Sequence, residues 1–287
     1  MSILKKVLIV FTILVVLVAS LAFDAFYSAP SRFTVRYETL ESIYIPEGLS
    51  DTSILFFSDL KYGPFMKEQR IQKLVQAINN LSPDVVIFGG DLFADDYKPS
   101  EDDKNIVKTT LKEISAPLGK FAVLGDTDQE TLDDMGTNKG LLYEADFEVL
   151  DNKSISIRNF GSDSITLVGL QNSVNGYANI TTAYENISRS SFTIAICHTP
   201  DTAKDVPTDL TKYFLAGHSL GGQVYYGLGS LYTPLKADYY FKGKHTVNDS
   251  VTLDITSGTG TVIKDVRFLS NAEIVLYRLK RKSIMAD

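Results

Sequence analysis

The sequence predicts an α/β domain built on a mixed β-sheet and preceded by one membrane-spanning helix. Three observations lead to this prediction: a 17-residue apolar run near the N-terminus, short apolar runs that alternate with helix-periodic segments after it, and more strand and turn punctuation in the second half. Short continuous apolar runs are typical of strands covered on both faces, and amphipathic segments between them are typical of packing helices. A mixed sheet is therefore favoured over a purely parallel one.

The N-terminal apolar run covers residues 7–23, is interrupted only by Thr12 and Ser20, and follows Lys5 and Lys6. As a helix it would be about 25 Å long at about 1.5 Å per residue, a little short of the hydrocarbon core of a bilayer. Lysines before such a run favour a cytoplasmic N-terminus, which sends the rest of the chain across the membrane. We expect a single-pass cell-membrane protein whose folded part is extracytoplasmic.

This interpretation divides the chain into two parts with one boundary between them. Residues 1–30 are expected to form a signal-anchor transmembrane helix with its connector, and residues 31–287 the folded domain. A cleaved signal peptide is the alternative, with Ser20-Leu21-Ala22 as a small-x-small site. The run is longer than the roughly 7 to 15 residues of a signal-peptide core, so we favour the uncleaved anchor.

Strands and helices are expected in alternation after the connector. The strand-like runs are residues 53–57, 85–88, 121–124, 192–197, 213–216, 251–256 and 274–279. Helical spacing is seen for two sets of apolar residues, Ile71, Leu74, Val75 and Ile78, and Ile106, Val107, Leu111 and Ile114. The two sets lie between the first three strands, as packing helices of an α/β domain would.

Composition narrows the possible partners. The net charge is −7, and without the first 23 residues 26 basic residues face 35 acidic ones, a charge of −9. A nucleic-acid partner is therefore not expected. The one cysteine, Cys197, cannot form an intramolecular disulfide, so stability must come from packing.

Five of the apolar runs are followed by a side chain that can bind a metal. In order, these residues are Asp59, Asp91, Asp126, His198 and His218. A single strand-end Asp is usually a turn or cap residue, and a single His is more often structural than a ligand. The carboxyl ends of strands in an α/β sheet lie beside the crevice where ligands bind, so five such residues can converge there. Two of the three histidines in the chain occupy these positions.

The motifs around these five residues resemble those of the calcineurin-like metallophosphoesterases, and within them the membrane-anchored bacterial YkuE-type branch. The pattern of that family reads D-x-H, G-D, G-N-H-D/E, a lone H, and G-H-x-H, often extended by G-G-Q. The matching stretches here are Asp59-Leu60-Lys61, Gly90-Asp91, Gly125-Asp126-Thr127-Asp128, His198, and Gly217-His218-Ser219-Leu220-Gly221-Gly222-Gln223. The resemblance implies a four-layer αββα sandwich of mixed sheets with a metal site at one sheet edge, and covers about residues 50–279.

The resemblance also implies two metal sites that share Asp91, and this sequence departs from the pattern at one of them. One metal would take Asp59 and two histidines, but Lys61 and Leu220 stand in their places. The other metal would take Asp91, Asp126, His198 and His218, with Asp126 in place of the usual Asn. We therefore expect one divalent transition metal ion, Mn, Fe or Zn, and consider a second doubtful.

Two substituted positions bear on catalysis. The family's catalytic histidine is replaced by Thr127, whose hydroxyl cannot supply a proton at neutral pH as imidazole can. Lys61 has two interpretations of equal weight. Its ammonium either neutralises Asp59 and Asp91 in place of the missing metal, or points into solvent as most lysines do.

Two functions remain open from the sequence. The first is a metal-dependent hydrolase of phosphate esters with a weakened one-metal site, acting on a phosphorylated small molecule or a lipid-linked phosphate of the cell envelope. The second is a catalytically inactive relative that binds metal or ligand as a surface module. No substrate-binding residue can be named. The tyrosines of the later half, such as Tyr226 and Tyr239, are expected to pack in strand-rich structure rather than line a groove.

Overall fold

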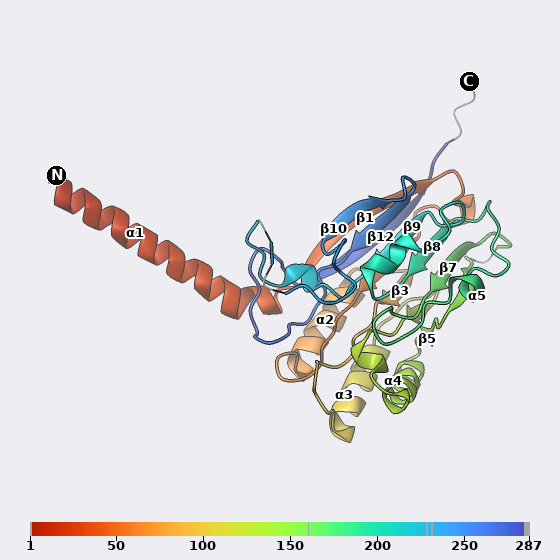
Figure 1. The fold of residues 1–287 in the computed structure, drawn as a ribbon, viewed down its shortest axis with the longest axis horizontal. Helices are drawn as coiled ribbons and strands as arrows, with labels where there is room; N and C mark the ends of the chain where they lie inside the picture. The colour runs from red at the N-terminus through yellow and green to blue at the C-terminus, as the bar shows by residue number, and fades with distance from the viewer. Residues whose placement is uncertain (1, 160, 228, 231, 284–287) are drawn as a thin grey trace.

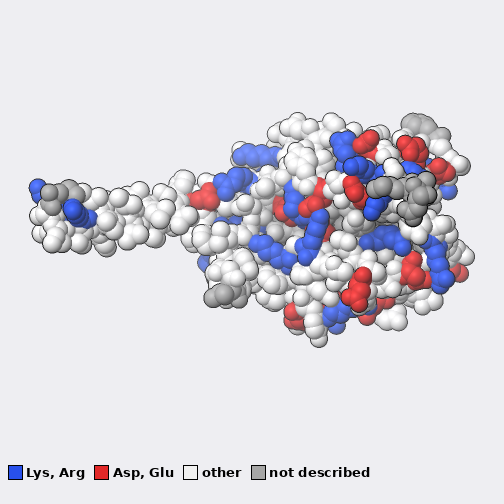
Figure 2. Space-filling model, turned by 90° about the horizontal axis from the view of Figure 1, so that it is seen from above, with Lys and Arg blue, Asp and Glu red and all other residues white. Residues whose placement is uncertain are grey.

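The computed structural model describes residues 2–159, 161–227, 229–230 and 232–283, and shows one long helix projecting from a folded domain (Figure 1). The helix, α1 (Ile3–Phe23), has no buried residue and continues through the short helices η1 (Asp24–Ser28) and η2 (Ala29–Ser31). Within the described residues, the stretch Ile3–Ser31 alone is long and apolar enough to cross a membrane. In the space-filling view the projecting rod carries basic side chains at its free end and no acidic residue until it meets the domain (Figure 2).

The domain is built on two mixed six-stranded sheets. The first sheet has the order β1-β12-β2-β3-β4-β5, with bounds Thr34–Ser42, Glu273–Arg281, Ser53–Phe57, Val85–Phe88, Lys120–Ala122 and Glu148–Val149. The second has the order β10-β11-β9-β8-β7-β6, with bounds Gly243–Val247, Val251–Ile255, Tyr213–Ala216, Thr193–Ile196, Ile165–Gly169 and Lys153–Ile157. In the first sheet β12 is antiparallel to β2, and in the second β10 and β6 are antiparallel edge strands.

Alternate residues of the central strands enter different cores, because side chains alternate across a strand. Ile54 and Phe56 of β2 pack in the core between the two sheets, with residues of β7, β8 and β9. Leu55 and Phe57 pack on the other face, against α2 (Glu68–Asn80), α3 (Glu101–Lys112) and α4 (Leu132–Glu144). The sandwich of layers that the resemblance implies is thus confirmed.

The outer layer on the second sheet is thin. Its core of buried residues combines the outward faces of β7, β8, β9 and β11 with residues of α5 (Ile180–Ala183) and the 3-10 helix η5 (Pro200–Lys204). Two further short 3-10 helices, η4 (Thr127–Gln129) and η6 (Leu220–Gly222), lie beside the ends of β4 and β9, and η3 (Glu47–Leu49) precedes β2. Long helices therefore cover the first sheet, whereas short turns cover much of the second.

The predicted elements are confirmed in their centres and incomplete at the sheet edges. The predicted runs 53–57, 85–88 and 213–216 coincide with β2, β3 and β9, and both predicted helices are present as α2 and α3. The strands β1, β5, β6, β7 and β10 and the helix α4 were not predicted. The short strand β4 ends at Ala122, two residues before the predicted end, because the chain there already turns toward the site.

Candidate metal centre

The five ligand-type residues all follow strands whose carboxyl ends meet at the same edge of the sandwich. Asp59, Asp91 and Asp126 follow β2, β3 and β4, which are mutually parallel, and His198 and His218 follow β8 and β9, which are parallel in the other sheet. Each side chain therefore reaches one point from a different element. The site lies between the two sheets, which is the convergence that the strand-end pattern predicts.

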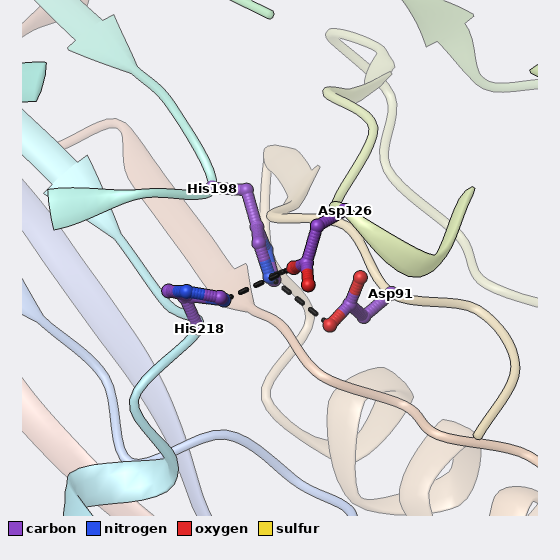
Figure 3. Close-up of side chains that lie close together, drawn as sticks. All are labelled: Asp91, Asp126, His198 and His218. Atoms are coloured by element: carbon purple, nitrogen blue, oxygen red, sulfur yellow. Dashed lines mark ion pairs between the residues drawn. The ribbon is translucent and has the colours of Figure 1, made fainter. Parts of the chain in front are cut away.

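Four of these side chains form a compact group (Figure 3). One ligand-type atom of each of Asp91, Asp126, His198 and His218 lies within 4.8 Å of the other three. His198 Nε2 lies 3.1 Å from Asp91 Oδ2 and 3.2 Å from Asp126 Oδ1, and His218 Nδ1 lies 3.0 Å from Asp126 Oδ1. Two carboxylates and two imidazoles at this spacing suit a tetrahedral or octahedral transition-metal ion.

The inward-facing atoms of the group lack hydrogen-bond partners. Asp59 Oδ1, Asp91 Oδ2, Asp126 Oδ1 and His198 Nε2 are all buried, and none has a partner with hydrogen-bond geometry. Buried polar atoms nearly always have a hydrogen-bond partner. Four such atoms without a partner, close together, therefore indicate that another group binds between them. The residues present therefore fit a divalent cation.

Both imidazoles are oriented by a backbone carbonyl on the side away from the group. His198 Nδ1 lies 2.6 Å from the carbonyl oxygen of Gly89, and His218 Nε2 lies 2.7 Å from that of Leu235. A ring nitrogen that donates to a carbonyl leaves the other nitrogen with its lone pair toward the centre. His198 is thus set to bind through Nε2 and His218 through Nδ1.

The carboxylates of the centre stabilise positive charge on the groups beside them. Burial would lower the pKa of His198, but the Asp91 and Asp126 carboxylates outweigh it and raise that pKa well above its ordinary value. Burial would raise the pKa of Asp126, but its contacts with the two histidines hold that pKa below the ordinary range. Burial raises the pKa of Asp59 above its ordinary value. A bound cation would replace the proton on His198 as the compensating charge.

Lys61 points into the centre and not into solvent. Its side chain is 3% exposed, its Nζ lies 2.6 Å from Asp91 Oδ2, and it also pairs with Asp95. The contact with Asp91 has ion-pair distance but not hydrogen-bond direction, which leaves Oδ2 free to face the group. Burial would lower the pKa of Lys61, but Asp91 and Asp95 outweigh it and raise that pKa. Of the two interpretations that the sequence left open, the structure supports the inward one.

Thr127 and Leu220 occupy the other two substituted positions. The Thr127 hydroxyl donates to Asp91 Oδ1 at 2.9 Å, and its backbone N–H reaches the same oxygen at 3.1 Å. This residue orients Asp91 and offers no acid group. Leu220 is fully buried, and its Cδ2 lies 3.0 Å from where a Cβ on Gly258 would be, a point that is also 2.8 Å from the Cβ of Asp59. An apolar side chain therefore lies near Asp59 where the resemblance implies a histidine.

Strained backbone marks the same loops. Left-handed φ angles occur at Asp59 (54°), Lys61 (50°), Asp91 (65°), His218 (71°) and Leu220 (51°). Non-glycine residues rarely adopt such angles, and they cluster where the surrounding structure fixes a functional geometry. The strain extends across both halves of the site, including the substituted positions.

Asp128 is part of the motif Gly125-Asp126-Thr127-Asp128, but it was not predicted to be a site residue. It is fully buried and accepts hydrogen bonds from the backbone N–H groups of Asp91 (2.7 Å), Leu92 (2.9 Å) and Gly125 (2.9 Å). Burial and the Asp91 charge raise its pKa to about 6, although the three N–H groups act against this. It holds the loops after β3 and β4 together. Gly125 permits this approach, since a Cβ there would lie 2.0 Å from Asp91 Oδ1.

A cavity of about 400 Å³ lies beside the centre. Its lining includes Thr127, Phe93, Tyr97, Lys98 and Lys104, and Thr127 links it directly to Asp91. Asp96, Glu130 and Asp134 also line it, so its charge is mixed rather than basic. No sequence pattern predicted this cavity, because its lining residues come from three separate segments.

Sequence comparisons place this geometry among known proteins. The chain is 26% identical over 258 residues to the uncharacterized metallophosphoesterase YkuE of Bacillus subtilis, covering 88% of each chain. It is 27% identical over 271 residues to an uncharacterized metallophosphoesterase of Aquifex aeolicus, covering 89% of this chain and 96% of the other. A relative named UDP-2,3-diacylglucosamine pyrophosphatase LpxG, from Chlamydia muridarum, is 24% identical over 220 residues, covering 60% of this chain and 64% of its own.

Two further comparisons complete the findings. No family model matches the sequence. The crystal structure of the calcineurin-like phosphoesterase YfkN from Bacillus subtilis aligns with a TM-score of 0.44 and 14% identity, covering 73% of this chain and 82% of that one.

The relatives and the paired mixed sheets agree on one class of protein. The chain is similar over most of its length to proteins named metallophosphoesterases, and its paired mixed sheets fit the calcineurin-like phosphoesterase fold. The bacterial YkuE-type branch fits it. This similarity implies dependence on a divalent metal, for which the four-residue group provides a candidate position.

Proposed function

We propose that this protein is a membrane-anchored, metal-dependent hydrolase of phosphate esters that works with a single metal ion. The observation that carries the proposal is the set of unsatisfied, buried atoms facing one point. Asp91, Asp126, His198 and His218 would hold the ion, and the names of the relatives support the hydrolase class. The metal would be Mn, Fe or Zn, because mixed carboxylate and imidazole ligands suit these ions.

A bound divalent cation supplies a Lewis acid that polarises a phosphate oxygen. Lys61 provides the second positive charge, because its ammonium lies beside Asp91 and is held there by Asp95. The Thr127 hydroxyl is engaged with Asp91 and the carbonyl of Phe93, so it does not protonate a leaving group. We therefore expect preference for esters whose leaving group departs without a proton, such as aryl phosphates and phosphoanhydrides.

The substrate is proposed to be a phosphorylated small molecule or a lipid-linked phosphate of the cell envelope. Support comes from α1, which keeps the domain at a membrane, and from the relative named as a pyrophosphatase of UDP-2,3-diacylglucosamine. The negative charge of the domain argues against nucleic acid.

The folded domain, residues 31–287, is proposed to lie outside the cytoplasmic membrane. Lys5 and Lys6 precede the apolar run and favour a cytoplasmic N-terminus. Protease added to spheroplasts should then digest the domain without lysis. Protection until the membrane is breached would show the opposite orientation, and release of a shortened soluble form would show a cleaved signal peptide.

Elemental analysis of the full chain in detergent tests the metal centre. We expect one equivalent of transition metal per chain and metal-dependent turnover of a panel of aryl phosphomonoesters and diesters. His218→Ala should abolish tight binding. His245→Ala is the matched control, because His245 lies outside the group, with its Nε2 3.0 Å from the carbonyl oxygen of Lys242.

Two outcomes would contradict this proposal. Two equivalents of tightly held metal would mean that Lys61 and Leu220 do not prevent a second site. One equivalent of metal without turnover of any ester would favour the inactive, ligand-binding alternative.

A further inference from the structure

A loop formed by residues 261–269, here called the anchor-side loop, runs from the metal centre to the base of α1. It begins directly after Gly260, whose N–H donates to the carbonyl oxygen of Asp59 at 2.6 Å. Toward its other end, the backbone N–H of Arg267 donates to the carbonyl oxygen of Ala25 at 2.9 Å. Ala25 lies two residues beyond the end of α1. One short segment thus contacts both the candidate site and the membrane helix.

The anchor-side loop is held firmly in this position. The Arg267 guanidinium is fully buried and donates to the carbonyl oxygens of Ser257 (2.8 Å), Gly258 (3.1 Å) and Gly260 (2.6 Å). Gln223 donates to the carbonyl oxygens of Val262 and Lys264 and accepts from the N–H of Val262. The loop is therefore joined to the segment after His218 as well as to the loop around Asp59.

Two apolar side chains at the turns of this loop face solvent. Ile263 is 77% exposed with φ of 62°, and Leu269 is 64% exposed with φ of 50°. A single exposed apolar residue on a protein surface is ordinary. A β-branched residue in the left-handed region is a genuine outlier, and such strain points to a functional constraint. Here the strained backbone presents isoleucine and leucine outward where glycine or asparagine would fit without strain.

Chain lengths limit how far these two residues can lie from the base of α1. Consecutive Cα atoms are about 3.8 Å apart, so Leu269 lies within about 8 Å of Arg267, and Ile263 within about 15 Å. The headgroup region on each side of a bilayer is about 5–8 Å thick. Phe26 and Tyr27, exposed directly after α1, mark the level at which aromatic residues usually meet that region.

The segment paired with the anchor-side loop adds an aromatic residue to the same surface. Tyr225 donates its backbone N–H to the carbonyl oxygen of Phe268, and Tyr226, next to it, is 54% exposed. This corrects the expectation that Tyr226 packs inside the domain. Figure 1 shows these cyan and blue loops at the domain end of α1.

We propose that Ile263 and Leu269 insert into the lipid interface of the membrane that α1 spans, and so hold the metal centre at the bilayer surface. Resting on the proposed function, this assigns the substrate class as phosphate groups carried on membrane lipids. The metal centre meets the lipid headgroups through the loops that start at Asp59 and His218. A soluble phosphate would need no such orientation.

Depth-dependent quenching on the full chain tests the insertion. The single-cysteine labels are Ile263→Cys and Leu269→Cys, each carrying an environment-sensitive fluorophore, with the protein in phosphatidylcholine liposomes whose acyl chains are brominated. The control is Leu132→Cys, since Leu132 is 87% exposed but begins α4, which lies further from α1 than α2 does in Figure 1. The native Cys197 is fully buried and should not react.

We expect brominated lipid to quench the labels at 263 and 269 at least twofold more than the label at 132. Equal quenching at the three positions, or none at any, would overturn the proposal. The readout needs no metal and no turnover. A protein without bound metal or turnover could still show the quenching, and a metal-dependent phosphoesterase could show none. The experiments therefore distinguish failure of the membrane-insertion proposal from failure of the proposed function.

Discussion

The two halves of the candidate centre differ in what occupies the space between the carboxylates. In one half, Asp126 Oδ1 and His198 Nε2 are buried without a hydrogen-bond partner, and His218 Nδ1 lies 3.0 Å from that Asp126 oxygen. In the other half, the Lys61 ammonium already lies beside Asp91, and Leu220 packs beside Asp59. The first half thus has ligand-type atoms placed where an ion could bind, whereas the second half already holds an ammonium and an apolar side chain.

The difference shows that lost ligands need not leave a defect in the fold. Lys61 and Thr127 both contact Asp91, and Leu220 is fully buried, so each substituted side chain is accommodated. Lys61 and Leu220 adopt left-handed backbone angles. An ammonium is a chemically suitable replacement for a cation between carboxylates. The fold thus accommodates these substitutions at its candidate metal centre.

Restoring the missing histidines of the altered half should have the largest effect, on both turnover and metal content. The triple variant Lys61→His, Thr127→His and Leu220→His returns both missing ligands and the imidazole acid. A positioned acid or base contributes about 10²–10⁴-fold to rate, so we expect turnover of phosphodiesters to rise by that order. Elemental analysis should give two metal equivalents instead of one.

The single variant Leu220→His is the control for this experiment, because one imidazole without the others cannot complete the site. It should bind one equivalent and keep the original rate. If the triple variant is folded by circular dichroism but still binds one equivalent, the altered half has lost more than its ligands.

Removing the internal cation should have the next largest effect, on stability. Lys61→Met keeps the length of the side chain but leaves Asp91 and Asp95 without their ammonium. Breaking a buried ion pair on one side destabilises a protein by about 3–5 kcal/mol. Urea unfolding of the chain in detergent with a chelator should show this loss, and added divalent metal should recover part of it.

Lys104→Met is the matched control, since Lys104 pairs with Glu101 on the surface of α3. Exposed pairs of this kind contribute about 0–1 kcal/mol. Equal stability of the two variants would mean that Lys61 is not the compensating charge of the altered half.

The fold could be predicted from the sequence where strands are buried on both faces. The runs of β2, β3 and β9 are continuous and apolar, and each matches its predicted range. The edge strands β6 and β10 carry Ser156, Lys244 and Thr246 on exposed positions, so they have no such run. The helix α4 contains Gly136 and Gly140 and has little apolar periodicity, so its sequence does not predict a helix.

The sequence predicted which residues could form the site, but not how their side chains are arranged. Strand-end spacing indicated which residues can meet, because parallel strands place their carboxyl ends at one edge. The direction of Lys61 depends on Asp95, a residue in a different loop, and the role of Asp128 depends on three backbone N–H groups. Neither dependence is visible in spacing or composition. That these residues bind metal stays a prediction.

Asp59 should matter less for metal binding than the four-residue group. Its Oδ1 lies 3.9 Å from His198 Nε2, and its Oδ2 accepts from the backbone N–H of His218 and from Ser58. It therefore positions His218 from outside the group, and changes to such partners lower metal affinity by about 10–100-fold. Asp59→Ala should show this loss by competition with a chelator.

Asp59→Asn is the control, because it keeps an acceptor for the His218 N–H and should recover most of the affinity. Complete loss of metal in Asp59→Ala, equal to that in His218→Ala, would show that Asp59 is itself a ligand. The division of the centre into two halves would then be wrong.

The smallest expected effect belongs to Thr127. Thr127→Val removes the hydroxyl, whose one proton can be donated to Asp91 Oδ1 or to the carbonyl oxygen of Phe93, but the backbone N–H of residue 127 still reaches Asp91. One hydrogen bond of this kind contributes about 1 kcal/mol, so urea unfolding should show that loss and metal affinity should fall less than in Asp59→Ala. Thr109→Val on α3, where the hydroxyl bonds only to its own helix, should change stability by less than about 0.5 kcal/mol. A loss of turnover in Thr127→Val without a loss of metal would mean that this hydroxyl acts on the substrate, and that the altered half retains a catalytic group.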